Sequence, residues 1–152
     1  MADNLYSPEQ DKVFITQVDT ALSAQKLSFS QQPYRVAQSR INDLTRLKKA
    51  ILTHQNDLVT ALSEDFSCRS HDDSKMGDIM PTLMGIDYAI KRIKKWMKPS
   101  KRHVGILFQP AKAYVMYQPL GVVGVITPWN YPVFLSLGPL TTLLAAGNNA
   151  MI

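Results

Sequence analysis

Hydrophobic residues in the first hundred positions recur every three or four residues, which is the spacing of amphipathic helices. Ser7, Pro8 and Gln10 form a helix start, with proline at the first helical position and a capping-box partner three residues after the serine. A first helix is therefore predicted from residue 8 to about residue 27. The positions predicted to face inward are Phe14, Val18, Ala21 and Leu22.

Two further helices are predicted from the same spacing. Beyond Pro33, a long amphipathic helix is expected, with a break near His54. Its apolar positions are Ile41, Leu44, Leu47, Ile51, Leu58 and Leu62. The third helix has candidate caps in residues 72–74, is expected to bend at Pro81 and ends before Pro99. Its apolar positions are Met76, Ile79, Leu83, Ile86, Ile90, Ile93 and Met97.

The helical spacing stops at residue 104, and short strand-like runs follow. Residues 104–108 and 113–117 flank a connection at residues 109–112, which predicts a β-hairpin. Residues 121–126 are apolar on both faces, as expected of a strand buried inside a parallel sheet.

The last thirty residues predict an unfinished βαβ unit. After the strand, Pro132 is well placed to open a helix, residues 135–146 continue it, and Gly147 with Asn148 provides a stop. Residues 150–152 then begin another apolar run. A strand, a helix and the start of a second strand form a parallel crossover unit. The expected fold class is therefore α/β.

Composition narrows the class of protein. The chain has 152 residues, 45% hydrophobic and 19% charged, which is typical of one globular domain. No apolar run reaches the roughly 18 residues of a membrane span, and the start lacks a secretion signal. Cys68 is the only cysteine, so an internal disulfide is excluded, and its polar surroundings favour an incidental thiol over a nucleophile. The three histidines share no metal-ligand spacing with it, so we expect no zinc site.

The net charge of +5 is concentrated in residues 91–102. The basic residues there are Lys91, Arg92, Lys94, Lys95, Lys98, Lys101 and Arg102. They could form a patch for nucleic acid or a membrane, or the solvated face of the third helix. The second interpretation is favoured, because the segment lacks the series of interleaved aromatic residues that a base-stacking surface requires.

Asn130 follows the predicted strand at residues 121–126, where ligands bind in open parallel sheets. Its amide could donate to a developing oxyanion, but asparagine is also a common turn residue, and residue chemistry alone favours the turn. Trp129 could stack on a ligand, although packing is the commoner role beside a buried strand. Gly121 and Gly124 do not form a dinucleotide-binding fingerprint.

Several separated sequence words resemble the aldehyde dehydrogenase superfamily. They are PLGVVGVITPWNYP at residues 119–132, LGPL at residues 137–140, LAAGNNAMI at residues 144–152 and, more loosely, DFSCRS at residues 65–70. Within the superfamily, KRIKKWMKP at residues 91–99 and LFQPAKAYVMYQPLGVVG at residues 107–124 resemble the short-subunit dimeric branch, and the coniferyl aldehyde dehydrogenases in particular.

The resemblance implies a division of the chain into three parts. Residues 1–100 would form an amino-terminal helical segment, and residues 101–118 a hairpin of the oligomerisation type. Residues 119–152 would begin a Rossmann-like NAD(P)-binding domain that is incomplete here. It also implies a cytoplasmic enzyme that forms a homodimer, binds NAD or NADP, has no membrane span and binds no nucleic acid.

The resemblance further implies a mechanism in which a cysteine thiolate attacks an aldehyde, hydride passes to the nicotinamide, and a glutamate-activated water releases the acid. Asn130 matches the asparagine that stabilises the oxyanion. The loop formed by Ile126, Thr127, Pro128 and Trp129 matches the loop that lines the cofactor cleft. The catalytic cysteine, the base and the glycine-rich turn are expected beyond residue 152, and Cys68 matches none of them. The chain alone is therefore expected to be inactive.

Two functions follow from these patterns. The first is a fragment of an NAD(P)-dependent enzyme that oxidises an aldehyde, of the aromatic coniferyl type, to a carboxylic acid. The alternative is a non-catalytic helical module that binds an acidic partner or nucleic acid through residues 91–102.

We expect residues 91–102 to attract nucleic acid only through charge, without preference for a sequence, and with an affinity that falls steeply as salt rises. Fluorescence anisotropy with labelled DNA and RNA at physiological salt measures this affinity. Submicromolar binding to a defined DNA or RNA would contradict the expectation and favour the binding module.

Overall fold

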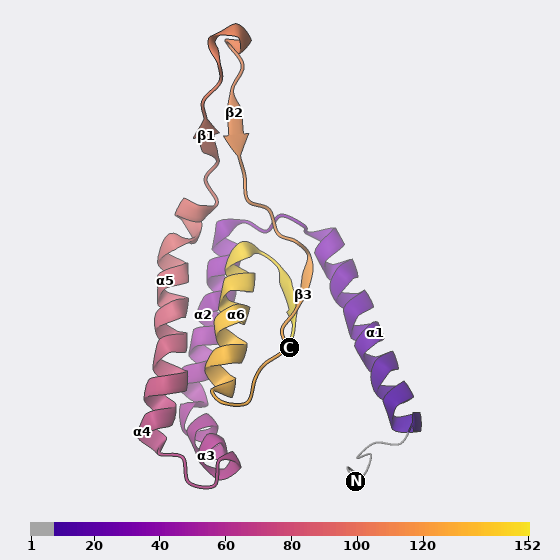
Figure 1. Ribbon diagram of the computed structural model, residues 1–152, viewed down its shortest axis with the longest axis vertical. Helices are drawn as coiled ribbons and strands as arrows, with labels where there is room; N and C mark the ends of the chain where they lie inside the picture. The colour runs from indigo at the N-terminus through magenta and orange to yellow at the C-terminus, as the bar shows by residue number, and fades with distance from the viewer. Residues whose placement is uncertain (1–7) are drawn as a thin grey trace.

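The computed structural model describes residues 8–152, so the predicted cap at Ser7 lies outside the described residues. Three helices run side by side in one bundle: α2 (Ala37–Thr53), α5 (Met80–Trp96) and α6 (Pro132–Ala146) (Figure 1). The short helices α3 (Gln55–Asp65) and α4 (His71–Ser74) close one end of the bundle. The buried core between these elements consists of Leu44, Ile51, Val59, Ile79, Ile86, Ala89, Ile93 and Ala145.

The predicted break near His54 is confirmed. Helix α2 ends at Thr53 and α3 begins at Gln55, and His54 between them leaves the helical conformation with φ −102° and ψ 16°. Leu44 and Ile51 of α2 are buried, as their spacing predicted. The axes of α2 and α3 therefore differ, and the apolar sides of both helices can face the same core.

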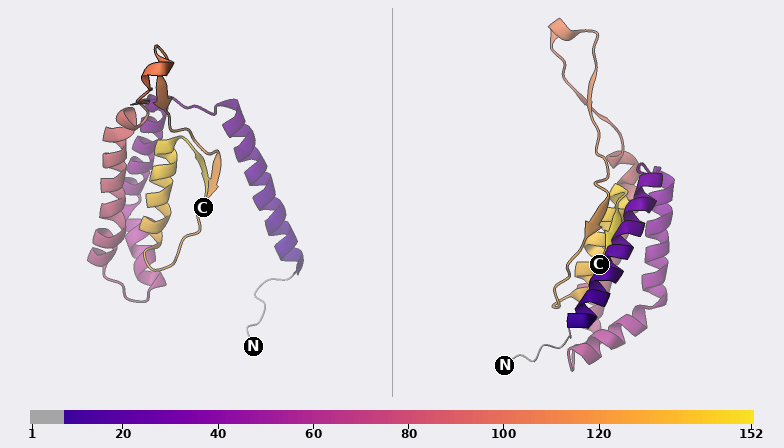
Figure 2. Two further views of the ribbon diagram at one scale, coloured as in Figure 1. Left: turned by 45° about the horizontal axis from the view of Figure 1, so that its top comes forward. Right: turned by 90° about the vertical axis from the view of Figure 1, so that its right-hand side faces the viewer.

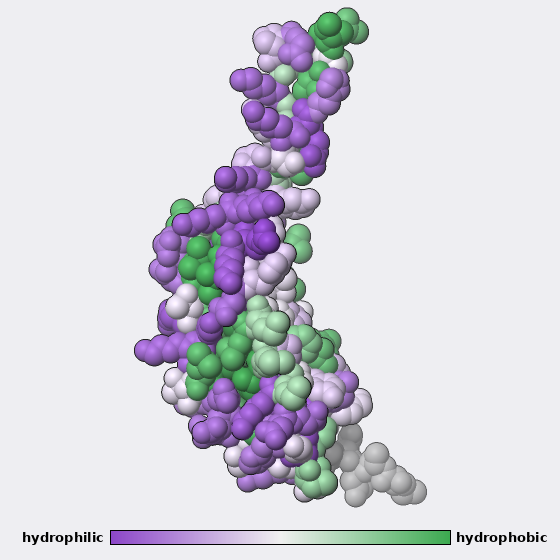
Figure 3. Space-filling view, turned by 90° about the vertical axis from the view of Figure 1, so that its left-hand side faces the viewer, coloured by the Kyte–Doolittle hydropathy of each residue, from purple (hydrophilic) through white to green (hydrophobic). Residues whose placement is uncertain are grey.

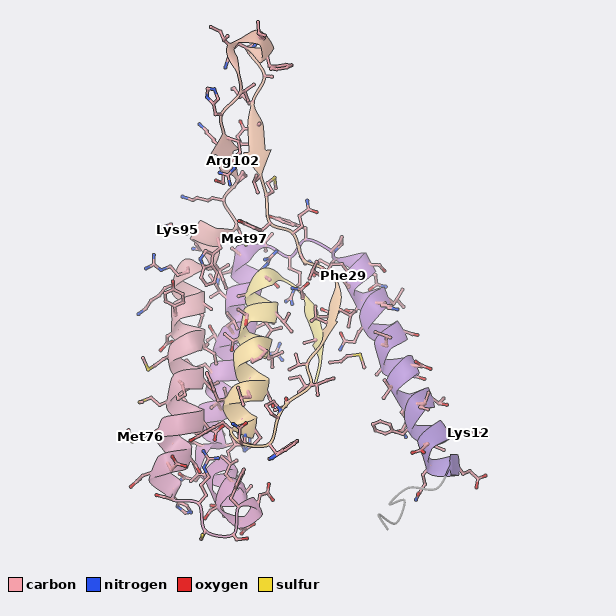
Figure 4. All side chains as sticks on the ribbon, viewed as in Figure 1. Lys12, Phe29, Met76, Lys95, Met97 and Arg102 are labelled. Atoms are coloured by element: carbon pink, nitrogen blue, oxygen red, sulfur yellow. The ribbon has the colours of Figure 1, made fainter. Side chains whose placement is uncertain are left out.

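The third predicted helix is wrong at its start. Ser70, rather than residues 72–74, is the cap, because its side-chain oxygen accepts from the amide of Asp72 at 3.2 Å. A wider π-helical turn, η1 (Lys75–Ile79), then precedes α5. The extra residue in that turn shifts the phase of the helix, so Met76 is 67% exposed on the outer side instead of facing inward (Figure 4).

The basic residues of α5 lie on its solvated face, as predicted. Ile86 and Ile93 are fully buried, while Lys94 and Lys95 in the last turn are exposed. Figure 3 shows a mostly hydrophilic surface over the stem of the hairpin and the adjoining end of the bundle, with hydrophobic side chains at the hairpin tip.

Helix α1 (Pro8–Gln31) extends four residues beyond its predicted end and stands apart from the bundle (Figure 2). The prediction that its apolar residues face inward is wrong, since Phe14 is 66% and Val18 38% exposed. Ala21 is exposed as well, and only Leu22 is half-buried. The helix contacts β3 and β4, where the side chain of Phe29 lies, and its amino-terminal half has little to pack against (Figure 4).

The hairpin is present but starts earlier than predicted. Strand β1 (Ser100–Arg102) pairs antiparallel with β2 (Ala113–Val115), and Ser100 lies opposite Val115. The predicted strand at residues 104–108 is wrong, because Ile106–Phe108 forms a 3-10 turn, η2. A two-stranded ribbon has no core, so apolar content does not decide which residues pair. Successive turn hydrogen bonds from residue 105 to residue 111 occupy this segment instead.

The predicted βαβ unit is confirmed. Strand β3 (Val122–Gly124) pairs in parallel with β4 (Asn149–Met151), and α6 connects them. Gly147 ends α6 with φ 90°, a left-handed conformation that suits glycine. The amides of Gly147 and Asn148 donate to the carbonyls of Leu144 and Leu143 at 3.0 and 2.9 Å, which closes the helix.

The first strand of this unit is not buried on both faces, contrary to the prediction. Its pairing ends within three residues, and Ile126 beyond it is 99% exposed. A parallel strand is covered on both faces only when further strands and helices surround it, and the described sheet has two strands.

We expect a polypeptide of residues 1–152 on its own to aggregate or to form only a partly ordered helical state. Both strands of the β3–β4 pair have an unpaired edge, and the hydrophobic side chains of Leu107, Leu120 and Ile126 are each more than 85% exposed. Size-exclusion chromatography and amide NMR spectra measure this. A monomer with dispersed resonances and cooperative unfolding would show the expectation to be wrong.

Candidate functional site

The predicted site residues lie on one loop between β3 and the start of α6. Ile126 is 99% and Trp129 85% exposed, and Pro128 and Asn130 are exposed as well. The expectation that Trp129 packs against the strand is therefore wrong for the described chain. Thr127 is half-buried, and its hydroxyl lies 2.9 Å from the hydroxyl of Ser136. The structure thus gathers all five residues on an open surface beyond the carboxyl end of β3.

A buried arginine holds the backbone of this loop. Arg69, whose side chain is 8% exposed, donates from Nη1 to the carbonyl oxygen of Asn130 at 3.2 Å. Its guanidinium also lies over the ring of Tyr131, 4.4 Å from the ring centre. A cation above an aromatic face is attracted by the ring electrons. Asn130 and Tyr131 are therefore both anchored by one side chain from the segment between α3 and α4.

The ring of Tyr131 also packs against the backbone of the π-helical turn at Gly77. A β-carbon on Gly77 would lie 2.5 Å from Cε1 of Tyr131, closer than side chains can approach. Glycine at this position lets the turn and the loop come into contact. The tyrosine ring is thus held by the backbone of η1 as well as by Arg69.

Asp78 in the same turn holds the amino-terminal end of α6. This carboxylate is fully buried, and its Oδ1 accepts from the amide of Phe134 at 2.8 Å. That amide belongs to the first turn of α6, where backbone amides lack helical partners and a negative charge is favoured. Its Oδ2 lies 3.3 Å from Nη2 of Arg69, as an ion pair without the geometry of a hydrogen bond.

A second buried charge holds the carboxyl-terminal end of α6. Arg40 of α2 is 4% exposed and donates to the carbonyl oxygens of Ala145 and Arg35 at 3.1 and 2.9 Å. Burial lowers the pKa of the Arg40 guanidinium, and the nearby Tyr34 partly opposes that shift. The guanidinium lies against Gly147, where a β-carbon would be 2.6 Å from its central carbon.

A hollow of about 500 Å³ lies near the carboxyl-terminal end of α6. Its lining includes Arg40, Trp96, Tyr117 and Leu120, and none of the predicted site residues. The walls are mainly apolar, and Nη2 of Arg40 is too deeply covered to reach a molecule there. This hollow is therefore separate from the Asn130 loop.

Sequence reasoning missed Arg69 and Asp78. A signal for Asp78 was present, because a charged residue beside Ile79 interrupts the apolar side of a predicted helix and needs a partner there. No comparable signal marked Arg69, which lies in a short polar segment next to the exposed Cys68.

Two kinds of feature are not found in residues 8–152. No helix there is long and apolar enough to span a membrane. No group of three or more histidine, cysteine, aspartate or glutamate side chains is arranged to hold a metal ion.

Sequence comparisons match the chain to one family of known proteins. The model of the aldehyde dehydrogenase family matches residues 10–152. A probable coniferyl aldehyde dehydrogenase of Pseudomonas aeruginosa is 51% identical over 144 residues, which cover 95% of this chain and 30% of that protein. A coniferyl aldehyde dehydrogenase of another Pseudomonas is 36% identical over 136 residues, covering 90% and 28%. The chain therefore spans no more than 30% of the length of either relative.

Solved structures agree as well. The substrate-bound state of AldH from Staphylococcus aureus matches with a TM-score of 0.83 at 30% identity, covering 88% of this chain and 29% of that one. PnpE in complex with nicotinamide adenine dinucleotide matches with a TM-score of 0.74 at 28% identity, covering 88% and 26%. These matches confirm the predicted α/β fold class and the predicted resemblance.

We expect Asp78→Ala to destabilise a full-length subunit that contains this segment by about 3–5 kcal/mol, because it leaves Arg69 and the Phe134 amide buried with fewer partners. Thermal unfolding at a fixed scan rate measures the loss. Asp73→Ala is the matched control, since Asp73 also pairs with Arg69 but is 52% exposed, and its removal should cost less than about 1 kcal/mol. Equal losses in the two variants would contradict the assignment of Asp78 as the anchor.

Proposed function

The chain belongs to the aldehyde dehydrogenase family, and we propose that it supplies the oxyanion-binding and cofactor-facing loop of an NAD(P)-dependent aldehyde dehydrogenase. The observation that carries the proposal is the loop after β3, where Asn130 is exposed and its backbone carbonyl is held by Arg69, whose guanidinium also lies over the ring of Tyr131. A site that stabilises a developing charge requires a polar side chain that can donate to it and a backbone that is held in place.

The proposed reaction is the oxidation of an aldehyde to a carboxylic acid. The two Pseudomonas relatives are called coniferyl aldehyde dehydrogenases, and the more similar one is 51% identical. We therefore propose an aromatic aldehyde of the coniferyl type as the substrate. The cysteine and the general base that this reaction needs are not among the residues assigned to the loop, so the loop contributes one part of the catalytic group.

Asn130 has the chemistry that the oxyanion role needs. No hydrogen bond from its side-chain amide is found among the described residues, and the side chain is exposed beyond the end of β3. A neutral amide donor strengthens its hydrogen bond as a carbonyl oxygen gains negative charge during thiolate attack. It therefore stabilises the transition state more than the bound aldehyde.

The neighbouring residues fit a nicotinamide cofactor. Ile126 and Trp129 present apolar side chains that are 99% and 85% exposed, a surface suited to the flat rings of a dinucleotide. The hydroxyl of Thr127 lies within hydrogen-bonding distance of the Ser136 hydroxyl in α6, and this contact fixes the backbone between them. The cofactor supplies the hydride acceptor, and the proposed role of Ile126, Thr127, Pro128 and Trp129 is to hold it beside the aldehyde.

The hairpin is proposed to serve assembly instead of catalysis. Ile106, Leu107 and Phe108 at its tip are 70–91% exposed, and the hairpin projects from the end of the bundle opposite α3 and α4 (Figure 1). We propose that residues 101–118 form part of the contact between two subunits of a homodimer. Residues 1–100 and 119–152 would then be the helical segment and the start of the cofactor domain.

We expect Asn130→Ala in a full-length subunit to lower kcat by roughly 10²–10³, by analogy with the loss of one donor from a hydrolase oxyanion hole. The affinity for cofactor and the melting temperature should change little, because the backbone contact to Arg69 does not use the side chain. Steady-state kinetics, cofactor titration and thermal unfolding measure the three quantities. A change confined to the melting temperature would show that Asn130 is only a turn residue.

Asn130→Asp is the sharper companion variant. It preserves the size of the side chain but places a carboxylate next to the developing negative charge, so it should be at least as damaging as alanine. Near-normal turnover in this variant would rule out the oxyanion role.

A further inference from the structure

We propose that Arg69 is a positioning residue for catalysis, which sets where the Asn130 amide stands when charge develops on the aldehyde oxygen. The proposal rests on the oxyanion role of Asn130 proposed above. Arg69 does not reach the reacting atoms itself. It acts through the backbone carbonyl of Asn130, to which its Nη1 donates at 3.2 Å.

One guanidinium connects three elements at this point. Its Nε donates to Oδ2 of Asp73 in α4 at 2.8 Å, and its Nη2 lies 3.3 Å from Oδ2 of Asp78 in η1. The remaining edge is directed to the carbonyl of Asn130, and the face lies over Tyr131. Only the planar, forked guanidinium group offers donors in these directions together with a flat face, and lysine does not. The side chain is 8% exposed, so its position is fixed by packing.

The anchored carbonyl restricts the side chain of the same residue. A carbonyl group held at a fixed point fixes the plane of the peptide bond between Asn130 and Tyr131. Pro132 restricts the residue before it, and Tyr131 takes φ −137° and ψ 67° at the start of α6. With the backbone held on this side, the direction in which the Asn130 side chain leaves the loop is restricted. Oxyanion donors need this, since they act at 2.7–3.1 Å from the developing charge.

Electrostatics favour a positional role over a direct effect of the arginine charge. Two carboxylates, Asp73 and Asp78, face the single guanidinium. The cluster therefore has no net positive charge that could stabilise an oxyanion at a distance. Removing Arg69 should change the rate through the loop, and the effect should disappear when Asn130 has no amide to position.

The test is a double-mutant cycle in a full-length subunit that contains this segment, with Arg69→Met, Asn130→Ala and the double variant. Arg69→Met should lower kcat by about 10-fold to 100-fold, the scale of a misplaced catalytic group, while KM for cofactor and aldehyde stays within about threefold. In the Asn130→Ala background, the same substitution should lower kcat by less than about twofold. Activities are expressed per folded subunit, measured by circular dichroism and size-exclusion chromatography.

Arg35→Met is the matched control, because Arg35 is also a partly buried, ion-paired arginine but lies before α2, near the other end of the bundle. It should leave kcat unchanged. Gly77→Ala gives an independent perturbation with every charge intact, since the new methyl group meets the Tyr131 ring from η1. It should lower kcat in the same direction as Arg69→Met, and it keeps the test available if Arg69→Met does not fold.

The outcomes separate the two proposals. If Asn130→Ala lowers kcat but Arg69→Met and Gly77→Ala do not, the positioning role is wrong and the oxyanion role stands. Equal losses from Arg69→Met with and without Asn130 would also overturn it, since Arg69 would then act independently. If Asn130→Ala itself leaves kcat unchanged, the proposed function fails, and the positioning role fails with it.

Discussion

The two buried charges at the ends of α6 determine how the rest of the structure is arranged. Asp78 accepts from an amide in the first turn of the helix, and Arg40 donates to a carbonyl in the last turn. Each charge has the sign that the helix dipole favours at its end. Both residues belong to the helical bundle. Their contacts therefore favour one direction of α6 and one position of this helix along α2 and α5. The strand before it and the strand after it follow from that placement.

The position of the candidate site depends on the same placement of α6. The loop after β3 is fixed where it enters α6, because Arg69 pairs with Asp78 and holds the carbonyl of Asn130. Its other residues stay exposed, with Ile126 and Trp129 the most open. A rigid end next to an open surface allows one side chain to be placed accurately while a cofactor and a substrate can still approach. Under the proposed function, the helical segment would contribute to the chemistry by holding the loop.

Sequence periodicity was sufficient for the elements that pack against a core. The break at His54, the buried Ile86 and Ile93, and the βαβ unit from Val122 to Met151 all agree with it. It failed where packing does not decide the structure, as in the first strand of the hairpin and the exposed Phe14 of α1. Periodicity also did not predict the π-helical turn, because one extra residue changes the phase of the helix without changing the composition. Arg69 and Asp78 are brought together only by the fold, and a linear pattern does not record that contact.

The most direct test of the oxyanion role of Asn130 is a crystal structure of a full-length subunit that contains this segment, trapped with cofactor and a covalent aldehyde adduct. We expect Nδ2 of Asn130 to lie about 2.7–3.1 Å from the adduct oxygen. Arg69 should still donate to the Asn130 carbonyl in that complex. An Asn130 amide turned away from the adduct oxygen, or bonded to the protein backbone as an ordinary turn residue, would contradict this role.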